Sequence, residues 1–168
     1  MERQSNSVPN EPTPFPVADE RRATVQAKNA WTAARGGSDV PELGALFDGS
    51  HQLGGDEFLI KVDDDTFDSV FIVFGEEIAM TLGERGVGSS VSRVADPVLR
   101  DMFSEACAES VRSGAAIYRD GTTMTTPHTM ASYRCNFMPV RSGFESVTMY
   151  VFGAFGINNE PVSERSAA

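Results

Sequence analysis

Residues 130–140, MASYRCNFMPV, decide the fold because their side chains alternate with the two-residue period of a β-strand. Tyr133, Cys135 and Phe137 occupy alternate positions, so we expect them to share one face of a sheet. The segments with the same period on either side are residues 115–123 and 145–155. The C-terminal part of the chain therefore predicts three consecutive strands.

A long helix is predicted directly before these strands. Asp96 is a favourable N-cap, Pro97 suits the first helical position, and Gly114 marks the end of the segment. Apolar and small side chains recur on one face of this segment: Leu99, Met102, Phe103, Ala106, Cys107 and Ser110. We expect this face to pack against the sheet.

Two more strands and two more helices are predicted in the N-terminal half. Strand composition occurs at residues 58–62 and 67–74, which Asp63-Asp64-Asp65-Thr66 joins as a hairpin. Residues 75–82 have helical composition with acidic side chains in the first turn. Residues 20–35 have small side chains at helical spacing and predict the first helix of the domain.

This order of elements predicts an α+β domain, in which a five-stranded antiparallel sheet carries its helices on one face. The domain is expected to span residues 20–157. Residues 1–19 contain four prolines among polar residues and are expected to be a disordered lead. Residues 158–168 have turn chemistry without a hydrophobic period and are expected to be a C-terminal tail.

The composition excludes several classes of protein. The chain has 168 residues, which suits one domain, and its 14 basic and 24 acidic side chains give a formal net charge of −10. This charge disfavours nucleic acid as a partner, and no segment approaches the roughly 18 consecutive apolar residues of a membrane-spanning helix. The two cysteines, Cys107 and Cys135, are typical of a reducing compartment. We expect a cytoplasmic protein of bacterial type that binds neither nucleic acid nor membranes.

Several short motifs follow one another in a recognisable order. They are Trp31 with Arg35-Gly36-Gly37 and Pro41, then Phe74-Gly75-Glu76-Glu77-Ile78, Gly83 and Gly88, and finally Arg134-Cys135-Asn136-Phe137-Met138-Pro139-Val140. In this order they resemble the PAS domain family, specifically short bacterial proteins made of little more than one PAS domain. The resemblance implies the sheet order 2-1-5-4-3, short helices over one face, an N-terminal flanking helix, and a pocket that either holds a small ligand or is packed.

Two candidate sites follow from this resemblance. The pocket is expected to be lined by side chains of the sheet and the helices over it: Phe71, Val73, Met80, Met102, Phe103, Tyr133, Cys135, Phe137, Met149 and Val151. The N-terminal helix is expected either to dock on its own sheet or to pair with its copy in a homodimer. The dimer contacts would then be Ala23, Ala27, Ala30, Trp31 and Ala34.

Motifs for catalysis, metals and nucleotides are incomplete. Residues 83–90 have the spacing of a phosphate-binding loop, but serine stands where the mechanism needs lysine. Residues 63–68 lack the oxygen ligand and the glycine that a calcium loop needs at its fifth and sixth positions. Cys135 and His128 could form a nucleophile and base, but a strand cysteine between aromatic residues is more typical of a core. No cofactor is assigned.

The resemblance implies a sensory or regulatory protein rather than an enzyme. We expect it to act by binding signalling proteins such as sensor kinases, with or without a small ligand in its pocket. Only 11 residues follow Ile157, which is too short for an output domain. The alternative is a small α+β hydrolase or isomerase, which would need a paired acid and base inside a similar cavity.

Overall fold

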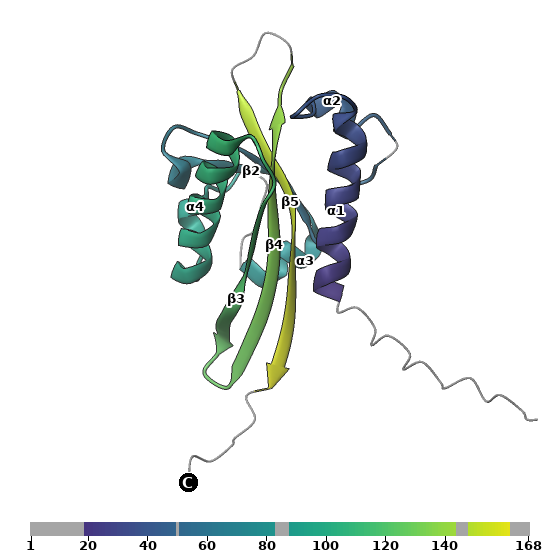
Figure 1. Ribbon diagram of the computed structural model, residues 1–168. Coiled ribbons are helices and arrows are strands. Elements are labelled where there is room, and N and C mark those ends of the chain that lie inside the picture. Colours follow the sequence, from purple (N-terminus) through teal and green to yellow (C-terminus); the bar gives the residue numbers. More distant parts are fainter. Residues whose placement is uncertain (1–18, 50, 83–87, 144–147, 162–168) are drawn as a thin grey trace, which may run out of the picture.

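The computed structural model describes residues 19–49, 51–82, 88–143 and 148–161. Within them, a five-stranded antiparallel sheet has the order β2-β1-β5-β4-β3 (Figure 1). The strands are β1 (Glu57–Lys61), β2 (Val70–Phe74), β3 (Ile117–Thr126), β4 (Thr129–Arg141) and β5 (Met149–Pro161). The predicted α+β class, the five strands and their order are confirmed.

The last strand extends beyond the end that the sequence predicts for the domain. β5 continues to Pro161, so the first residues of the predicted tail lie in the sheet. Thr129 of β4 pairs with Pro161, and Ala131 pairs with Asn159. Backbone hydrogen bonds can continue a strand past its last apolar side chain. The hydrophobic period in the sequence therefore ends earlier than the strand. Residues 1–18 of the predicted lead, and residues 162–168, lie outside the described part of the chain.

Helices lie on both faces of the sheet, whereas the order of elements predicted them on one face (Figure 1). On one face, α3 (Glu76–Leu82) and α4 (Pro97–Ser113) pack together with the 3-10 turn η2 (Val91–Arg93). On the other face lie α1 (Asp19–Arg35) and the short helix α2 (Leu43–Leu46), which the sequence did not predict. We call these the α4 face and the α1 face.

The limits of α4 come from local chemistry. The Asp96 carboxylate accepts a hydrogen bond from the backbone N–H of Val98 at 2.8 Å, and Pro97 follows it at the first helical position. At the other end, Gly114 has φ 65°, in the left-handed region that glycine adopts without steric cost. The predicted helix is therefore found with its predicted ends.

Phenylalanine rings fill the α4 face. Phe103 of α4 contacts Phe58 of β1 and Phe137 of β4, with ring centroids 5.4 and 5.3 Å apart. None of these three side chains has exposed surface. Edge-on aromatic contacts of this kind add stability beyond the apolar area that they bury.

Two hydrogen-bonding side chains fix α1 to its face of the sheet. The indole Nε1 of Trp31 donates to the Pro139 carbonyl at 2.9 Å. Asn136 of β4, fully buried, donates from Nδ2 to the Thr24 carbonyl at 2.8 Å. Its Oδ1 accepts from the backbone N–H of Ala154 in β5, also at 2.8 Å. Helix, β4 and β5 are thus joined by one amide side chain.

Candidate functional site

The expected pocket is occupied by a packed core. Seven of its ten predicted residues lie together on the α4 face with at most 8% of their surface exposed: Phe71, Met102, Phe103, Tyr133, Cys135, Phe137 and Val151. Phe71 and Phe103 are in ring contact at 5.6 Å. Between Phe71, Ile78 and Leu82 there is no volume that a water molecule could occupy. At these residues the structure agrees with the packed one of the two expected alternatives, because side chains fill the space.

The other three predicted residues lie elsewhere. Val73 and Met80 are 37% and 82% exposed, so they do not face the core. Met149 is half-buried and borders a separate surface depression of about 520 Å³ with Lys61 and Arg112. At Val73 the two-residue period fails because of a register shift: Phe71 pairs with Ile60, but Val73 pairs with Leu59, whose side chain lies on the α1 face. At Met80 the inward face of the helix was predicted wrongly.

The predicted dimer contacts on the N-terminal helix are used inside the monomer. Ala23, Ala27 and Trp31 have 7%, 0% and 2% of their surface exposed and pack on the α1 face. Ala30 and Ala34 are partly buried against the same cluster. The helix therefore docks on its own sheet, the other arrangement that the sequence left open, and pairing of this helix with a second copy stays a prediction.

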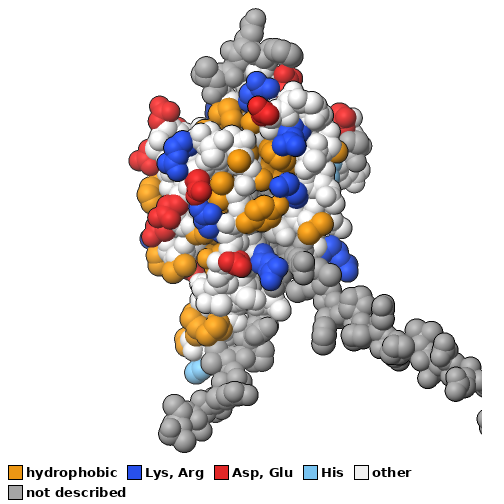
Figure 2. Space-filling view, in the orientation of Figure 1, with side chains coloured by type: hydrophobic (Ala, Val, Ile, Leu, Met, Phe, Trp, Pro, Cys, Tyr) orange, Lys and Arg blue, Asp and Glu red, His pale blue; other side chains and the backbone are white. Residues whose placement is uncertain are grey.

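An open groove lies at the end of the molecule where α4 begins. Its volume is about 670 Å³, and its apolar lining comes from α3, α4, β3, β4 and β5. We call it the methionine groove and define it by six of its residues: Met80, Leu82, Val98, Met124, Met130 and Ile157. Figure 2 shows apolar side chains at the tip of the β3–β4 hairpin and beside the first turn of α4.

The groove gathers exposed apolar surface. Met80, Val98, Met124 and Met130 are 82%, 53%, 50% and 42% exposed, and they are half of the eight large exposed hydrophobic side chains among the described residues. Exposed apolar side chains are ordinary when scattered, but a contiguous patch marks a binding surface. Methionine is flexible and polarizable, so three of these side chains can adapt to a bound surface.

A polar contact holds the two walls of the groove in place. The Thr123 hydroxyl of β3 donates to the second carboxylate oxygen of Asp96, while the first oxygen caps α4. Met124 and Met130 face each other across the hairpin as Cα partners. The carboxylate in the groove is therefore engaged in positioning β3 against α4, and the remaining lining offers mainly apolar contact.

The two thiols lie in the core. Cys107 and Cys135 have no exposed surface and are unpaired as a disulfide. Burial raises the pKa of the Cys107 thiol, and burial together with the nearby Cys107 raises the pKa of Cys135. His128 lies exposed in the turn between β3 and β4. The structure does not bring Cys135 and His128 together as a nucleophile and base.

One titratable pair was not expected from the sequence. His51 Nε2 lies 2.6 Å from Glu57 Oε2, and the carboxylate side chain is almost buried. The His51 ring also meets the Phe152 ring edge-on, with centroids 5.8 Å apart. The pair connects the segment before β1 to the α1 face, which is a packing role.

Metal-binding clusters and membrane-spanning helices are both absent from the described ranges. Among these residues, no group of three or more His, Cys, Asp or Glu side chains is placed to hold a metal ion. No helix in the described ranges combines the length and the apolar character needed to cross a bilayer.

The sequence pointed to Met80 only as a lining of the internal pocket and gave no place in a site to Met124, Met130 or Val98. Pro127-His128 did signal a hairpin turn between the two methionines, but a count outward from this turn places Met124 opposite Ala131. The observed pairing of Met124 with Met130 depends on a register shift between Met124 and Thr126. Val98 carried no such signal, because an exposed apolar residue in the first turn of a helix is common.

No protein-family model matches the chain, and no curated protein is significantly similar to it. Among solved structures, the chain is similar to a domain of an HTR-like protein from Haloarcula marismortui. The sequence identity is 20% and the TM-score 0.43, with 59% of this chain and 96% of that chain covered.

Proposed function

We propose that this protein is a PAS-like sensory or regulatory domain that acts by binding a signalling protein, such as a sensor kinase, in the methionine groove. The observation that carries the proposal is the groove itself, where four exposed apolar side chains lie together. The order of motifs that resembles PAS domains and the sheet order give it support.

The packed core favours this function over sensing by an internal ligand. The side chains expected to line a pocket contact one another on the α4 face. A small molecule bound there would have to displace aromatic rings such as Phe103, which close packing makes costly. The methionine groove instead opens to the surface, where a partner's apolar side chains have access.

The enzyme alternative finds less support in the same region. The groove contains the Asp96 carboxylate, but both of its oxygens accept hydrogen bonds that hold the structure together. A general acid or base needs a positioned partner group near the reacting atoms. We therefore keep protein binding as the proposed function.

The test is affinity capture from cell extract with matched variants. Met80→Glu combined with Met130→Glu places charge in the groove at exposed positions, so the fold is expected to be retained. The control is Val73→Glu, which adds charge at an exposed apolar residue of β2 outside the groove. Signalling proteins recovered with the parent and the control, but lost with the groove variant, would support the proposal. Recovery of the same proteins by all three would exclude the groove as their binding site.

A second measurement separates the protein partner from a small ligand. Native mass spectrometry of the purified protein reports any retained small molecule, since the groove volume of about 670 Å³ falls in the range of ligand sites. We expect the mass of the bare chain. A stoichiometric small molecule that disappears in the groove variant would assign the groove to that ligand instead.

A further inference from the structure

The two edges of the sheet differ in how their backbone groups are used. At the β2 edge, Phe71 donates to the Ser89 carbonyl and accepts from Gly88, at 2.9 and 2.8 Å. Val91 donates to the Ser69 carbonyl at 2.8 Å, so residues 88–91 cover this edge. At the other edge lies β3, and no described segment apart from β4 gives it a backbone–backbone hydrogen bond.

The sequence of β3 leaves most of this edge unprotected. Natural proteins protect exposed edges with lysine, proline, bulges or a covering segment. Residues 121–124, GTTM, carry no charge, no proline and no bulge, since the one register shift of this strand pair lies beyond them, between Met124 and Thr126; three of the four have side chains of good strand propensity or apolar character. Such an edge is a template for pairing with another strand.

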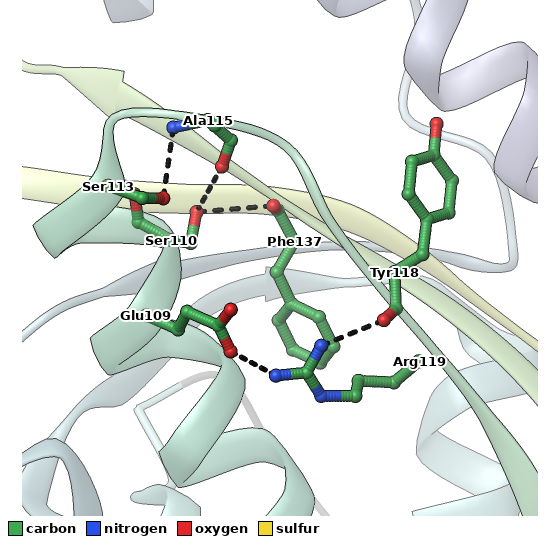
Figure 3. A network of polar contacts seen from close by, with 7 residues as sticks. All are labelled: Glu109, Ser110, Ser113, Ala115, Tyr118, Arg119 and Phe137. Carbon is green, nitrogen blue, oxygen red and sulfur yellow. Dashed lines mark hydrogen bonds and ion pairs between the residues drawn. The ribbon is translucent and has the colours of Figure 1, made fainter.

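At the beginning of β3, the side chain of Arg119 contacts both α4 and its own strand (Figure 3). Arg119 forms an ion pair with Glu109 of α4 and donates from Nη1 to the Tyr118 carbonyl at 2.9 Å. In Figure 3 the guanidinium lies between the helix and the start of the strand. These contacts draw the arginine side chain toward α4 and give the Tyr118 carbonyl one donor. A carbonyl oxygen can accept a second hydrogen bond, so β3 from Tyr118 onward can still pair with another strand.

The charges on β3 select a register for pairing with a second copy. Two copies joined edge to edge, antiparallel, are related by a two-fold axis perpendicular to the sheet, so one residue lies opposite itself. An axis at Arg119 or Asp120 would place like charges opposite each other, which is destabilising. An axis at Gly121 avoids both contacts.

This register also brings exposed apolar side chains together. With the axis at Gly121, Tyr118 lies opposite Met124 of the second copy, and Asp120 lies opposite Thr122. Tyr118 and Met124 are 53% and 50% exposed in the monomer. An aromatic ring and a methionine sulfur form a favourable cross-strand contact. Figure 2 shows apolar and basic side chains on the surface between α4 and α1, where β3 lies.

We propose that this protein forms a homodimer in which β3 pairs antiparallel with β3 of a second copy about a two-fold axis at Gly121, joining the two sheets into one. This dimer differs from the helix-mediated dimer expected from the sequence, and it does not rest on the proposed function. Because Met124 also lines the methionine groove, the two grooves of the dimer adjoin its interface.

Charge variants at one exposed position test the register. Thr122→Asp places a second acid opposite Asp120 of the other copy, whereas Thr122→Lys places a base there; Thr122 is exposed, so both should fold. Each change occurs twice per dimer, so we expect the dimer Kd to rise at least about tenfold for aspartate and to fall about threefold for lysine. The measurement is sedimentation velocity over a concentration series. Thr32→Asp and Thr32→Lys, at an exposed position of α1, control for the change in net charge.

Cross-linking tests the same register independently of affinity. Tyr118→Cys and Met124→Cys proteins are mixed and oxidised, and a disulfide is expected only between the two different variants, because residues 118 and 124 lie opposite each other. Neither variant alone should cross-link with itself. The native thiols Cys107 and Cys135 are fully buried and do not compete.

The proposal is overturned if the parent protein sediments as a monomer throughout the series. It is also overturned by a dimer that responds alike to the Thr122 and Thr32 variants, or by variants that cross-link only with themselves. None of these results concerns the groove, so failure of the dimer and failure of the proposed function are distinguishable.

Discussion

The two faces of the sheet are stabilised in different ways. On the α4 face, large apolar rings such as Phe103 fill the space between helix and sheet, and burial of area provides the stability. On the α1 face, the helix presents alanines beside the single large side chain of Trp31, and its position is set by Trp31 and Asn136 through directed hydrogen bonds. Apolar burial has no preferred direction, whereas a hydrogen bond fixes register and orientation. The difference predicts distinct effects of substitution on the two faces.

The largest effect is expected on the α4 face. Phe103→Ala removes a fully buried ring at the centre of the aromatic cluster, so we expect it to lower the free energy of unfolding by about 3–5 kcal/mol. Urea unfolding followed by far-UV circular dichroism measures the change. Val98→Ala on the same helix, 53% exposed, is the control and should change stability by less than about 0.5 kcal/mol. Equal effects of the two substitutions would contradict the described packing.

A smaller but more localised effect is expected on the α1 face. Asn136→Ala removes the acceptor of the buried Ala154 N–H and one donor to the Thr24 carbonyl. We expect it to lower the free energy of unfolding by about 1–3 kcal/mol. Trp31 is the one tryptophan in the chain, so its fluorescence reports on the packing of α1 against the sheet. In the parent, fluorescence and circular dichroism should unfold together. In Asn136→Ala, we expect the fluorescence transition to come first.

The control for this variant is Asn158→Ala, which removes the same amide at an exposed position of β5. It should leave both transitions unchanged. If Asn136→Ala shifts the two signals equally, α1 unfolds only with the whole domain, and the two faces are less independent than their contacts indicate.

The smallest effect is a pH dependence that belongs to the α4 face. Burial raises the pKa of Cys107 and Cys135 in the folded protein, while a thiol in the unfolded chain ionises with a pKa of about 8.5. The unfolded state therefore releases protons first as the pH rises, so stability is retained below about pH 8.5 and falls above it. At about pH 9.5 we expect each thiol to lower the free energy of unfolding by about 1 kcal/mol.

Thermal unfolding at neutral pH and at about pH 9.5 measures this loss, with Cys107→Ala as the matched variant. The variant has one thiol fewer, so its stability should fall less between the two pH values than that of the parent. An identical fall in both proteins would show that other groups, such as Tyr133, account for the alkaline loss. Burial is the largest of the causes that raise the pKa of Tyr133, and this phenol ionises at higher pH than a thiol.

The helix and strand segments were largely predictable because they depend on local properties of the chain. The Asp96-Pro97 start and Gly114 end of α4 were identified from capping chemistry, and the buried face of that helix from its apolar period. In β4, the prediction that Tyr133, Cys135 and Phe137 share one face was also confirmed. The sheet order came from the resemblance to PAS domains rather than from any local pattern.

The candidate site was less predictable because it depends on distances between segments. Phe71 and Phe137 were identified as inward-facing, but the sequence could not say whether a cavity or the Phe103 ring lies between them. Likewise, the small residues of α1 suit either a partner helix or a sheet, and the same period describes both. Met124 and Met130 became a groove wall only because Thr123 and Asp96 hold the hairpin against α4.

Asn136 and Gly153 show the difference between what the sequence determines and what only the tertiary structure decides. The sequence by itself determined that residues 130–140 form a strand with two distinct faces, since alternation of side chains follows from backbone geometry. Only the tertiary structure turned Asn136 into the amide that joins α1, β4 and β5. It also makes glycine necessary at position 153, where a Cβ would lie 1.9 Å from the Asn136 carbonyl oxygen. Periodicity is a property of neighbours along the chain, whereas packed cores, grooves and buried hydrogen bonds depend on residues that only folding brings together.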